Sequence, residues 1–268
     1  MKLFYRVLGA GRPIVIAHGL YGSSDNWISI AKLLAQKFEV ILVDLRNHGQ
    51  SPHSTSHSYS DLADDLFELF NKLKLSHACL IGHSMGGKAA MQFAINHPNK
   101  LKSLIVVDIA PKSYADTNGY APQAKEHLTI LSALRELPLR ELTSRSEAEE
   151  LLSNKIPSLQ TRQFLLKNLD RDENNIFYWK LNIDALWQKL PSLMGGIKIT
   201  EGYTPSQEFP VLFIKGEQSQ YIDVAEDKQM IDQLFPSAKI ITIPGAGHWI
   251  HAEQPKLFIE AVEEFLGC

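Results

Sequence analysis

Four continuous apolar runs occur in the first part of the chain, at residues 14–17, 40–43, 78–81 and 104–107. Together they are rich in Val, Ile and Leu, and they lack the alternation of a half-exposed strand. Unbroken runs of this kind are typical of parallel strands that are covered on both faces of a sheet. A weaker, alternating run at residues 3–7 predicts a short edge strand.

Helical periodicity fills the segments between these runs. Residues 27–36 and 88–96 carry apolar side chains at helical spacing, and His97 and Pro98 end the second of these segments. Residues 60–73 place their leucines on one side, with Ser60 at the expected N-cap. Strands that alternate with helices predict an α/β fold, a mostly parallel central sheet flanked by helices and joined by right-handed crossovers.

The pattern changes after Pro111. Between residues 113 and 204 no strand candidate of comparable strength occurs. Helical segments, separated by polar joints or by joints with Pro or Gly, are predicted there instead, at residues 122–134, 147–154, 160–168 and 182–189.

Alternation returns near the end of the chain. Strands are predicted at residues 210–214 and 239–243, and helices at 224–235 and 255–266. We therefore expect one α/β core, residues 1–111 and 206–268, that is interrupted by an inserted helical cap at residues 112–205. A cap placed there covers the sheet edge at which α/β proteins bind ligands.

Composition narrows the class of protein. The chain has 268 residues, of which 44% are hydrophobic and 21% charged, as expected for one globular domain with an insertion. The formal net charge is −3 and no basic stripe occurs, so nucleic acid and anionic membrane surfaces are not expected partners. No apolar run approaches the roughly 18 residues of a membrane span, and residues 1–6 do not resemble a secretory signal. The default expectation is a cytoplasmic monomer, with Cys79 and Cys268 unpaired.

The clearest chemical signal is the pentapeptide Gly-His-Ser-Met-Gly at residues 82–86. It stands between the strand at 78–81 and the helix at 88–96, which is the context of a nucleophile elbow. Glycines on either side of the serine let strand and helix approach closely. Ser84 is therefore the predicted nucleophile.

A histidine follows the last predicted strand, in the sequence Gly-Ala-Gly-His at residues 245–248. An imidazole with a pKa near neutral can accept the serine proton and return it to a leaving group. His248 is the predicted base. We prefer it to His251 because the glycines precede it and because the order serine, acid, histidine is preserved.

The candidate acid does not stand at its usual position in the sequence. An aspartate is usual in the loop after the strand at 210–214, but Ser219 stands at that position. Asp108, directly after the run at 104–107, is the predicted acid, because that strand ends at the same sheet edge. Glu217 and Asp223 remain alternatives.

An acyl-transfer site also needs two N–H groups that face the developing oxyanion. Met85, the residue after the nucleophile, is expected to supply one from its backbone. The loop His-Gly-Leu at residues 18–20, after the run at 14–17, is expected to supply the other from Leu20.

A polar loop at residues 44–51 follows the second strand. We expect Asp44 and Arg46 to pair and to hold this loop in a structural role. His48, His53 and His57 lack the i, i+4 spacing of helical zinc motifs and have no adjacent acidic or cysteine partner, so solvated histidines are expected rather than metal ligands. The chain has no P-loop and no Gly-x-Gly-x-x-Gly motif, so no metal and no nucleotide cofactor is expected.

These motifs, His-Gly at 18–19, Asp-x-Arg-x-x-Gly-x-Ser at 44–51, the elbow at 82–87 and Gly-x-Gly-His at 245–248, follow the order of the α/β-hydrolase superfamily, which the chain resembles over nearly its whole length. The segments at 107–111, 216–221 and 247–253 are similar to the YbfF-type bacterial esterases, relatives of the abhydrolase-domain-11 proteins.

The resemblance implies a carboxylesterase with a helical cap that acts on short- to medium-chain acyl esters, with acyl thioesters as a further class. It implies no cofactor, and it implies an acid after the strand that follows the nucleophile helix, where Asp108 stands. A carbon–carbon bond hydrolase or a lyase on the same scaffold, and a non-catalytic ligand receptor, stay open as alternatives.

Overall fold

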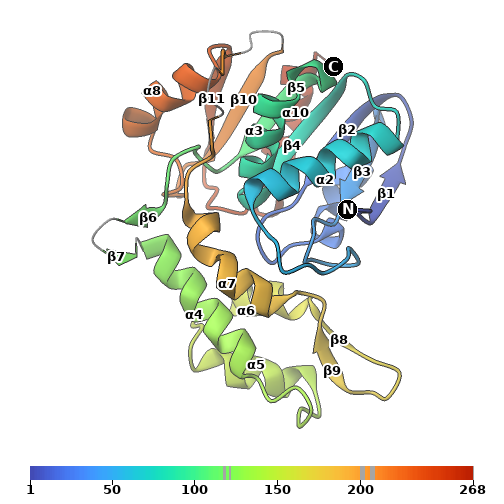
Figure 1. Cartoon of the computed structure of the whole chain (residues 1–268), viewed down its shortest axis with the longest axis vertical. Coiled ribbons are helices and arrows are strands. Elements are labelled where there is room, and N and C mark those ends of the chain that lie inside the picture. Colours follow the sequence, from blue (N-terminus) through green and yellow to red (C-terminus); the bar gives the residue numbers. More distant parts are fainter. Residues whose placement is uncertain (117–118, 121, 200–202, 206–208, 268) are drawn as a thin grey trace.

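The computed structural model describes residues 1–116, 119–120, 122–199, 203–205 and 209–267. Its centre is a seven-stranded sheet in which only the edge strand β1 runs antiparallel to its neighbour (Figure 1). The predicted strands are confirmed, each lengthened or shifted by a residue or more. In spatial order they are β1 (Tyr5–Leu8), β3 (Phe38–Val43), β2 (Arg12–Ala17), β4 (Ala78–His83), β5 (Leu101–Val107), β10 (Val211–Gly216) and β11 (Ala238–Ile243).

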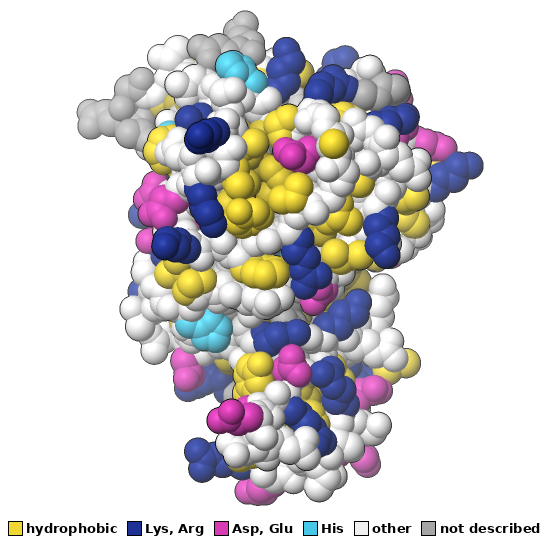
Figure 2. All heavy atoms as spheres, turned by 90° about the vertical axis from the view of Figure 1, so that its right-hand side faces the viewer, with side chains coloured by type: hydrophobic (Ala, Val, Ile, Leu, Met, Phe, Trp, Pro, Cys, Tyr) yellow, Lys and Arg dark blue, Asp and Glu magenta, His cyan; other side chains and the backbone are white. Residues whose placement is uncertain are grey.

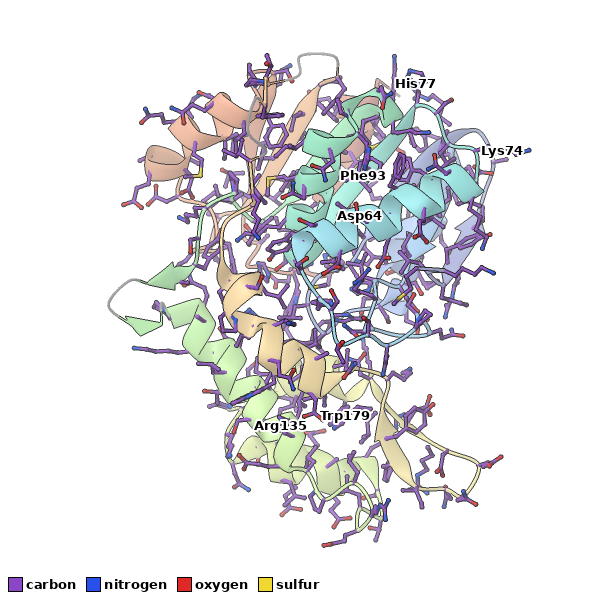
Figure 3. All side chains as sticks on the ribbon, in the orientation of Figure 1. Asp64, Lys74, His77, Phe93, Arg135 and Trp179 are labelled. Carbon is purple, nitrogen blue, oxygen red and sulfur yellow. The ribbon has the colours of Figure 1, made fainter. Side chains whose placement is uncertain are left out.

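Successive side chains of a strand enter two different hydrophobic clusters, one on each face of the sheet. In β2, Val15 belongs to the cluster that includes α2 (Tyr59–Lys72), α3 (Met85–Asn96) and α8 (Val224–Leu234). Its neighbours Ile14 and Ile16 belong to the cluster that includes α1 (Ile28–Leu34) and α10 (Pro255–Leu266). Burial on both faces explains why these strands are continuously apolar in sequence. On the first face, Phe93 of α3 lies beside α2 (Figure 3).

Helix α2 begins two residues earlier than a cap at Ser60 requires. Ser58 is the N-cap: its hydroxyl accepts the Asp61 N–H at 3.2 Å, while the Asp61 carboxylate accepts the Ser58 N–H at 2.9 Å. This reciprocal pair is a capping box. Ser60 lies exposed in the first turn, so its assignment as the cap was wrong.

Between β5 and β10, the described residues form four helices, here called the helical block (Figure 1). They are α4 (Pro122–Glu136), α5 (Arg145–Ser153), α6 (Leu159–Leu166) and α7 (Ile183–Met194). Two short hairpins also occur there, β6–β7 (Ala115–Asp116 and Gly119–Tyr120) and β8–β9 (Leu169–Arg171 and Phe177–Trp179). Strands of two or three residues are too short to leave a periodic signal, which is why the sequence predicted only helices.

The helical block is tied internally and to the sheet. Trp179 of β9 donates its indole N–H to the Leu134 carbonyl of α4 at 3.2 Å (Figure 3). Apolar side chains of the block join the same hydrophobic cluster as α2 and α3. The block therefore packs as a continuation of the core.

The chain enters and leaves the helical block at neighbouring points. Lys88 of α3 donates from Nζ to the Lys112 carbonyl at 2.8 Å and to the Gly195 carbonyl at 2.5 Å. The Tyr114 N–H donates to the Met194 carbonyl at 2.7 Å. One buried lysine side chain next to the elbow thus bonds both connecting segments, and burial lowers its pKa to about 7.

Positive and negative side chains are interspersed over the face shown in Figure 2, with no stripe of one sign. Within the described ranges, no helix is long and apolar enough to cross a bilayer. Cys79 lies buried and unpaired in β4, and Cys268 is outside the described residues.

Candidate active site

Ser84 lies at the apex of the turn between β4 and α3. Its backbone has φ 53° and ψ −119°, a combination that side chains rarely adopt. The Ser84 N–H donates to the Val107 carbonyl at 3.0 Å, which fixes the turn against β5. A Cβ at Gly82 would lie 2.3 Å from the Gly86 carbonyl oxygen, so a side chain at this position would separate strand from helix.

Three side chains from distant parts of the sequence meet at this turn. His248 Nε2 lies 3.0 Å from Ser84 Oγ, and His248 Nδ1 lies 2.7 Å from Asp108 Oδ2. Asp108 is completely buried, and its second oxygen accepts the Gly216 N–H at 3.0 Å. The Ser219 hydroxyl also donates to Asp108 Oδ2. The structure therefore brings together the serine, histidine and aspartate that the sequence selected.

The alternative candidates are not part of this line of contacts. Glu217 is exposed and accepts the Gly245 N–H at 2.8 Å. Asp223 is the N-cap of α8. His251 is buried and stacks on Trp27 at 3.9 Å between ring centroids. None of these three side chains contacts Ser84 or Asp108 among the interactions of the described residues.

Two groups that sequence reasoning missed surround the imidazole of His248. The Tyr221 ring stacks on it, with centroids 4.0 Å apart and planes 21° apart. His83 Nε2–H donates to the His248 carbonyl at 2.9 Å, and burial lowers the pKa of His83 well below its usual value. His83 is a variable position of the pentapeptide, so only its place beside the nucleophile marked it in sequence.

The two predicted oxyanion donors lie next to the serine. Leu20 follows β2, and Met85 is the first residue of α3. Throughout the part of the chain that the structure describes, neither backbone N–H donates to an acceptor. N–H groups without an acceptor at a helix start are available to a developing anion.

The loop after β3 differs from the sequence expectation, because Asp44 and Arg46 do not pair. Asp44 accepts backbone N–H bonds from Ser24 at 2.6 Å and Gln50 at 2.8 Å. Arg46 instead binds Asp65 of α2 through Nε at 2.6 Å and through a second nitrogen at 2.8 Å. The partner of Arg46 comes from a helix that packs beside the loop, which nearness in sequence does not reveal.

The histidines of this region also differ. His53 is exposed as expected, but the prediction of solvated side chains was wrong for His48 and His57, which are buried. Burial lowers the pKa of His48 well below its usual value and that of His57 to about 3. Both rings are therefore neutral at pH 7. Within the described ranges, no cluster of His, Cys, Asp and Glu is suited to hold a metal ion.

A cavity of about 350 Å³ opens on Ser84 and His248. The helical block contributes part of its wall through side chains that include His127, Ile130 and Phe164. Burial lowers the pKa of His127 to about 4, so this ring is neutral at pH 7. Among the described residues that line the cavity there is no lysine and no arginine.

Known proteins share this architecture. A family model described as alpha/beta hydrolase fold matches residues 12–255. Over 262 residues the chain is 40% identical to the sn-1-specific diacylglycerol lipase ABHD11 of Danio rerio, with 96% of this chain and 79% of that protein covered. Over 254 residues it is 34% identical to Esterase YbfF of Escherichia coli, with 95% and 92% covered.

A solved structure titled "Marine microorganism esterase" has a TM-score of 0.93 and 48% sequence identity, and the match covers 98% of this chain and 99% of that one. Together with the family model over residues 12–255, these relatives show that the chain belongs to the α/β-hydrolase fold family and is a hydrolase of the esterase/lipase type.

Proposed function

We propose that this hydrolase is a serine esterase that forms an acyl-enzyme on Ser84. The observation that carries the proposal is the unbroken line from Ser84 Oγ through both nitrogens of His248 to the buried Asp108, at the wall of the cavity. A nucleophile hydrogen-bonded to a base that is itself oriented by a third group is the arrangement of nucleophilic acyl transfer.

The proposed reaction has two halves, acylation and deacylation of Ser84, and His248 and Asp108 act in both. His248 Nε2 accepts the Ser84 proton while Ser84 Oγ attacks the ester carbonyl, and the N–H groups of Leu20 and Met85 hold the oxyanion. His248 then protonates the leaving alcohol, which departs from the acyl-enzyme. Water, deprotonated by His248, releases the acid and restores Ser84. Asp108 orients the imidazole and stabilises its charged form.

The proposed substrates are short- to medium-chain acyl esters, with acyl thioesters as a second class. Predominantly apolar walls and a volume of about 350 Å³ suit an acyl chain of modest length. The absence of lysine and arginine from the described lining favours a neutral substrate over an anionic one. The Danio rerio relative is named for diacylglycerol, which is a neutral acyl ester.

The helical block is proposed to act as the cap of this site, as an insertion at residues 112–205 in a core of residues 1–111 and 206–268. It contributes His127, Ile130 and Phe164 to the cavity wall. A cap in this position sets the size of the acyl site and keeps bulk water from the acyl-enzyme.

The test is hydrolysis of p-nitrophenyl butyrate by the wild-type protein beside Ser84→Ala. We expect turnover by the wild type and loss of at least about a thousandfold in the variant, because the covalent route requires the hydroxyl. A ladder of acyl lengths and matched thioesters then defines the substrate class. A folded wild type that turns over none of these esters contradicts the proposal, and a β-diketone substrate then tests the carbon–carbon hydrolase alternative.

A further inference from the structure

The residue directly after the proposed oxyanion donor has a strained backbone. Tyr21 has φ 63°, in the left-handed region that a bulky side chain rarely adopts. Rotation about its N–Cα bond turns the peptide unit that joins it to Leu20. The φ angle of Tyr21 therefore sets the orientation of the Leu20–Tyr21 peptide, which adjoins the peptide that carries the Leu20 N–H. A strained conformation of this kind persists only where neighbouring groups hold it.

Hydrogen bonds from two sides hold Tyr21 in place. On the core side, its N–H donates to His48 Nε2 at 3.2 Å. On the cap side, its carbonyl accepts a bond from Asn168 Nδ2 at 2.8 Å. Asn168 follows α6, is 3% exposed, and also donates to the Leu165 carbonyl at 3.2 Å. The buried side-chain amide of Asn168, in the cap, thus fixes the peptide that contains the Tyr21 carbonyl.

The tautomer of His48 makes this bond possible. His48 Nδ1 lies 2.9 Å from the Arg46 carbonyl and must carry the proton there, so Nε2 is left as an acceptor for the Tyr21 N–H. The phenol of Tyr21 reaches the cap as well, because its hydroxyl donates to the His127 carbonyl at 3.4 Å.

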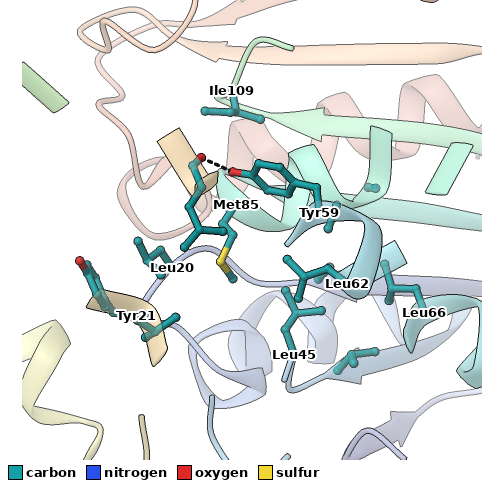
Figure 4. Packing of buried hydrophobic residues seen from close by; sticks show 14 of the residues in the cluster. Leu20, Tyr21, Leu45, Tyr59, Leu62, Leu66, Met85 and Ile109 are labelled. Carbon is teal, nitrogen blue, oxygen red and sulfur yellow. Dashed lines mark hydrogen bonds between the residues drawn. The ribbon is translucent and has the colours of Figure 1, made fainter. Parts of the chain in front are cut away.

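A second set of contacts leads from the cap to the other oxyanion donor. Asn182, the N-cap of α7, donates its N–H to the Asn47 carbonyl and its amide to Asn47 Oδ1, both at 3.0 Å. The Asn47 amide donates to His57 Nδ1 at 3.1 Å, and His57 Nε2 lies 3.4 Å from Met85 Sδ. Met85 and Leu20 line one small cavity together with Ser84 (Figure 4).

We propose that the cap positions the oxyanion hole and that Asn168 is a positioning residue, which acts through Tyr21 on Leu20. This inference rests on the proposed function. When the Asn168 amide is removed, the Tyr21 carbonyl loses its buried donor, and the strained residue relaxes toward an ordinary negative φ. The turn around it, which the Gly22 N–H closes on the Gly19 carbonyl at 2.9 Å, then loosens, and the peptide that carries the Leu20 N–H turns away from the oxyanion. The cap is thus a part of the apparatus that stabilises the transition state, in addition to being a wall of the cavity.

The test compares Asn168→Ala with wild type on the same p-nitrophenyl ester. We expect kcat to fall about tenfold, less than the 10²–10³ lost when an oxyanion donor is itself removed. KM should stay unchanged, because ground-state binding does not use the oxyanion hole. Affinity for an arylboronic acid, whose adduct with a serine is tetrahedral, should fall by the same factor as kcat. Asn154→Ala, the same substitution at the exposed C-cap of α5, is the matched control and should keep wild-type values.

Asn168→Leu repeats the test with the shape of the side chain preserved, in case the alanine variant does not fold. A leucine has no donor for the Tyr21 carbonyl, so the same loss in kcat is expected. A folded Asn168 variant with wild-type kcat and boronate affinity, or with a loss in KM alone, overturns the inference.

The labelling rate of Ser84 by a fluorophosphonate separates this inference from the proposed function, since labelling needs no ester turnover. Slower labelling of the Asn168 variants supports the positioning role even if the wild type hydrolyses no ester, a result that would sink only the proposed esterase activity. Equal labelling rates overturn the positioning role whatever the substrate is.

Discussion

At the scale of single residues, the proposed acid follows a different strand from the usual one, and a serine stands at the usual position of the aspartate. Asp108 follows β5, while Ser219, which stands where an aspartate is usual, donates its hydroxyl to Asp108. Residues Val107 of β5 and Ile214 of β10 are paired in register, so the loops after them meet. Asp108 could be proposed as the acid from sequence because it follows a buried strand, but its bond to Ser219 depends on the order of strands in the sheet.

The exchange of Asp108 for Asn should lower kcat by about 10⁴, because an amide does not stabilise the charged imidazole and favours the wrong tautomer. Steady-state kinetics on p-nitrophenyl butyrate measure the loss. Glu217→Gln, the same carboxylate-to-amide change in the neighbouring loop, is the control and should retain wild-type kcat. Near-normal activity of the Asp108 variant with loss in the Glu217 variant would reverse the assignment of the acid.

Residue-level reasoning failed where burial decides the role of a side chain. In sequence, Arg46 looks like the partner of Asp44, and His48 and His57 look like solvated side chains of a polar loop. Each is instead buried and bonded to a partner from another element or to the loop itself. Their partners are distant in sequence or are backbone groups, and neither kind of partner leaves a pattern in the chain.

At the scale of elements, long periodic segments were predicted well and short ones were missed. Helix α2 is an example, because its apolar face predicted the helix but not its first residue. Two serines stand two positions apart at its start, and only the geometry of the turn distinguishes the cap from its neighbour. The hairpins β6–β7 and β8–β9 lie below the length at which alternation is visible.

Ser58→Ala should lower the free energy of unfolding by about 1 kcal/mol, because it removes the N-cap acceptor of α2. Ser60→Ala, in the exposed first turn of the same helix, is expected to leave it nearly unchanged. Urea denaturation of both variants beside wild type measures the two values. Equal losses in both variants would show that the cap contributes no more than an exposed serine does.

At the scale of the whole molecule, the protein buries several histidines in neutral form. Burial lowers the pKa of His48 and His83 well below the usual value, and lowers those of His57 and His251 to about 3. In the unfolded chain these groups titrate near 6.5. The unfolded state therefore binds more protons below pH 6.5, so the stability contributed by these groups is complete above that pH and is lost as pH falls toward the folded values.

We therefore expect the free energy of unfolding to fall steadily between pH 7 and pH 5. His251→Phe should weaken this dependence by about 2 kcal/mol over that interval, since one group that takes up a proton on unfolding is removed. Phenylalanine keeps the stack on Trp27, and His251 Nδ1 has no hydrogen-bond partner among the described residues. Denaturation curves at both pH values measure the difference. The same pH dependence in both proteins would mean that His251 is protonated equally in the folded and unfolded states.

Both ends of the helical block meet at Lys88, and this affects how such an enzyme can change during evolution. Lys88 Nζ bonds the segments before and after the helical block, so the two ends of this segment of the chain lie side by side. The entropy of closing an excursion grows only slowly with its length, and insertions are tolerated best where their ends already adjoin. A different module can therefore occupy the same pair of junctions without a change in the sheet. An exchange of this kind alters the shape of the cavity while Ser84, His248 and Asp108 stay where they are.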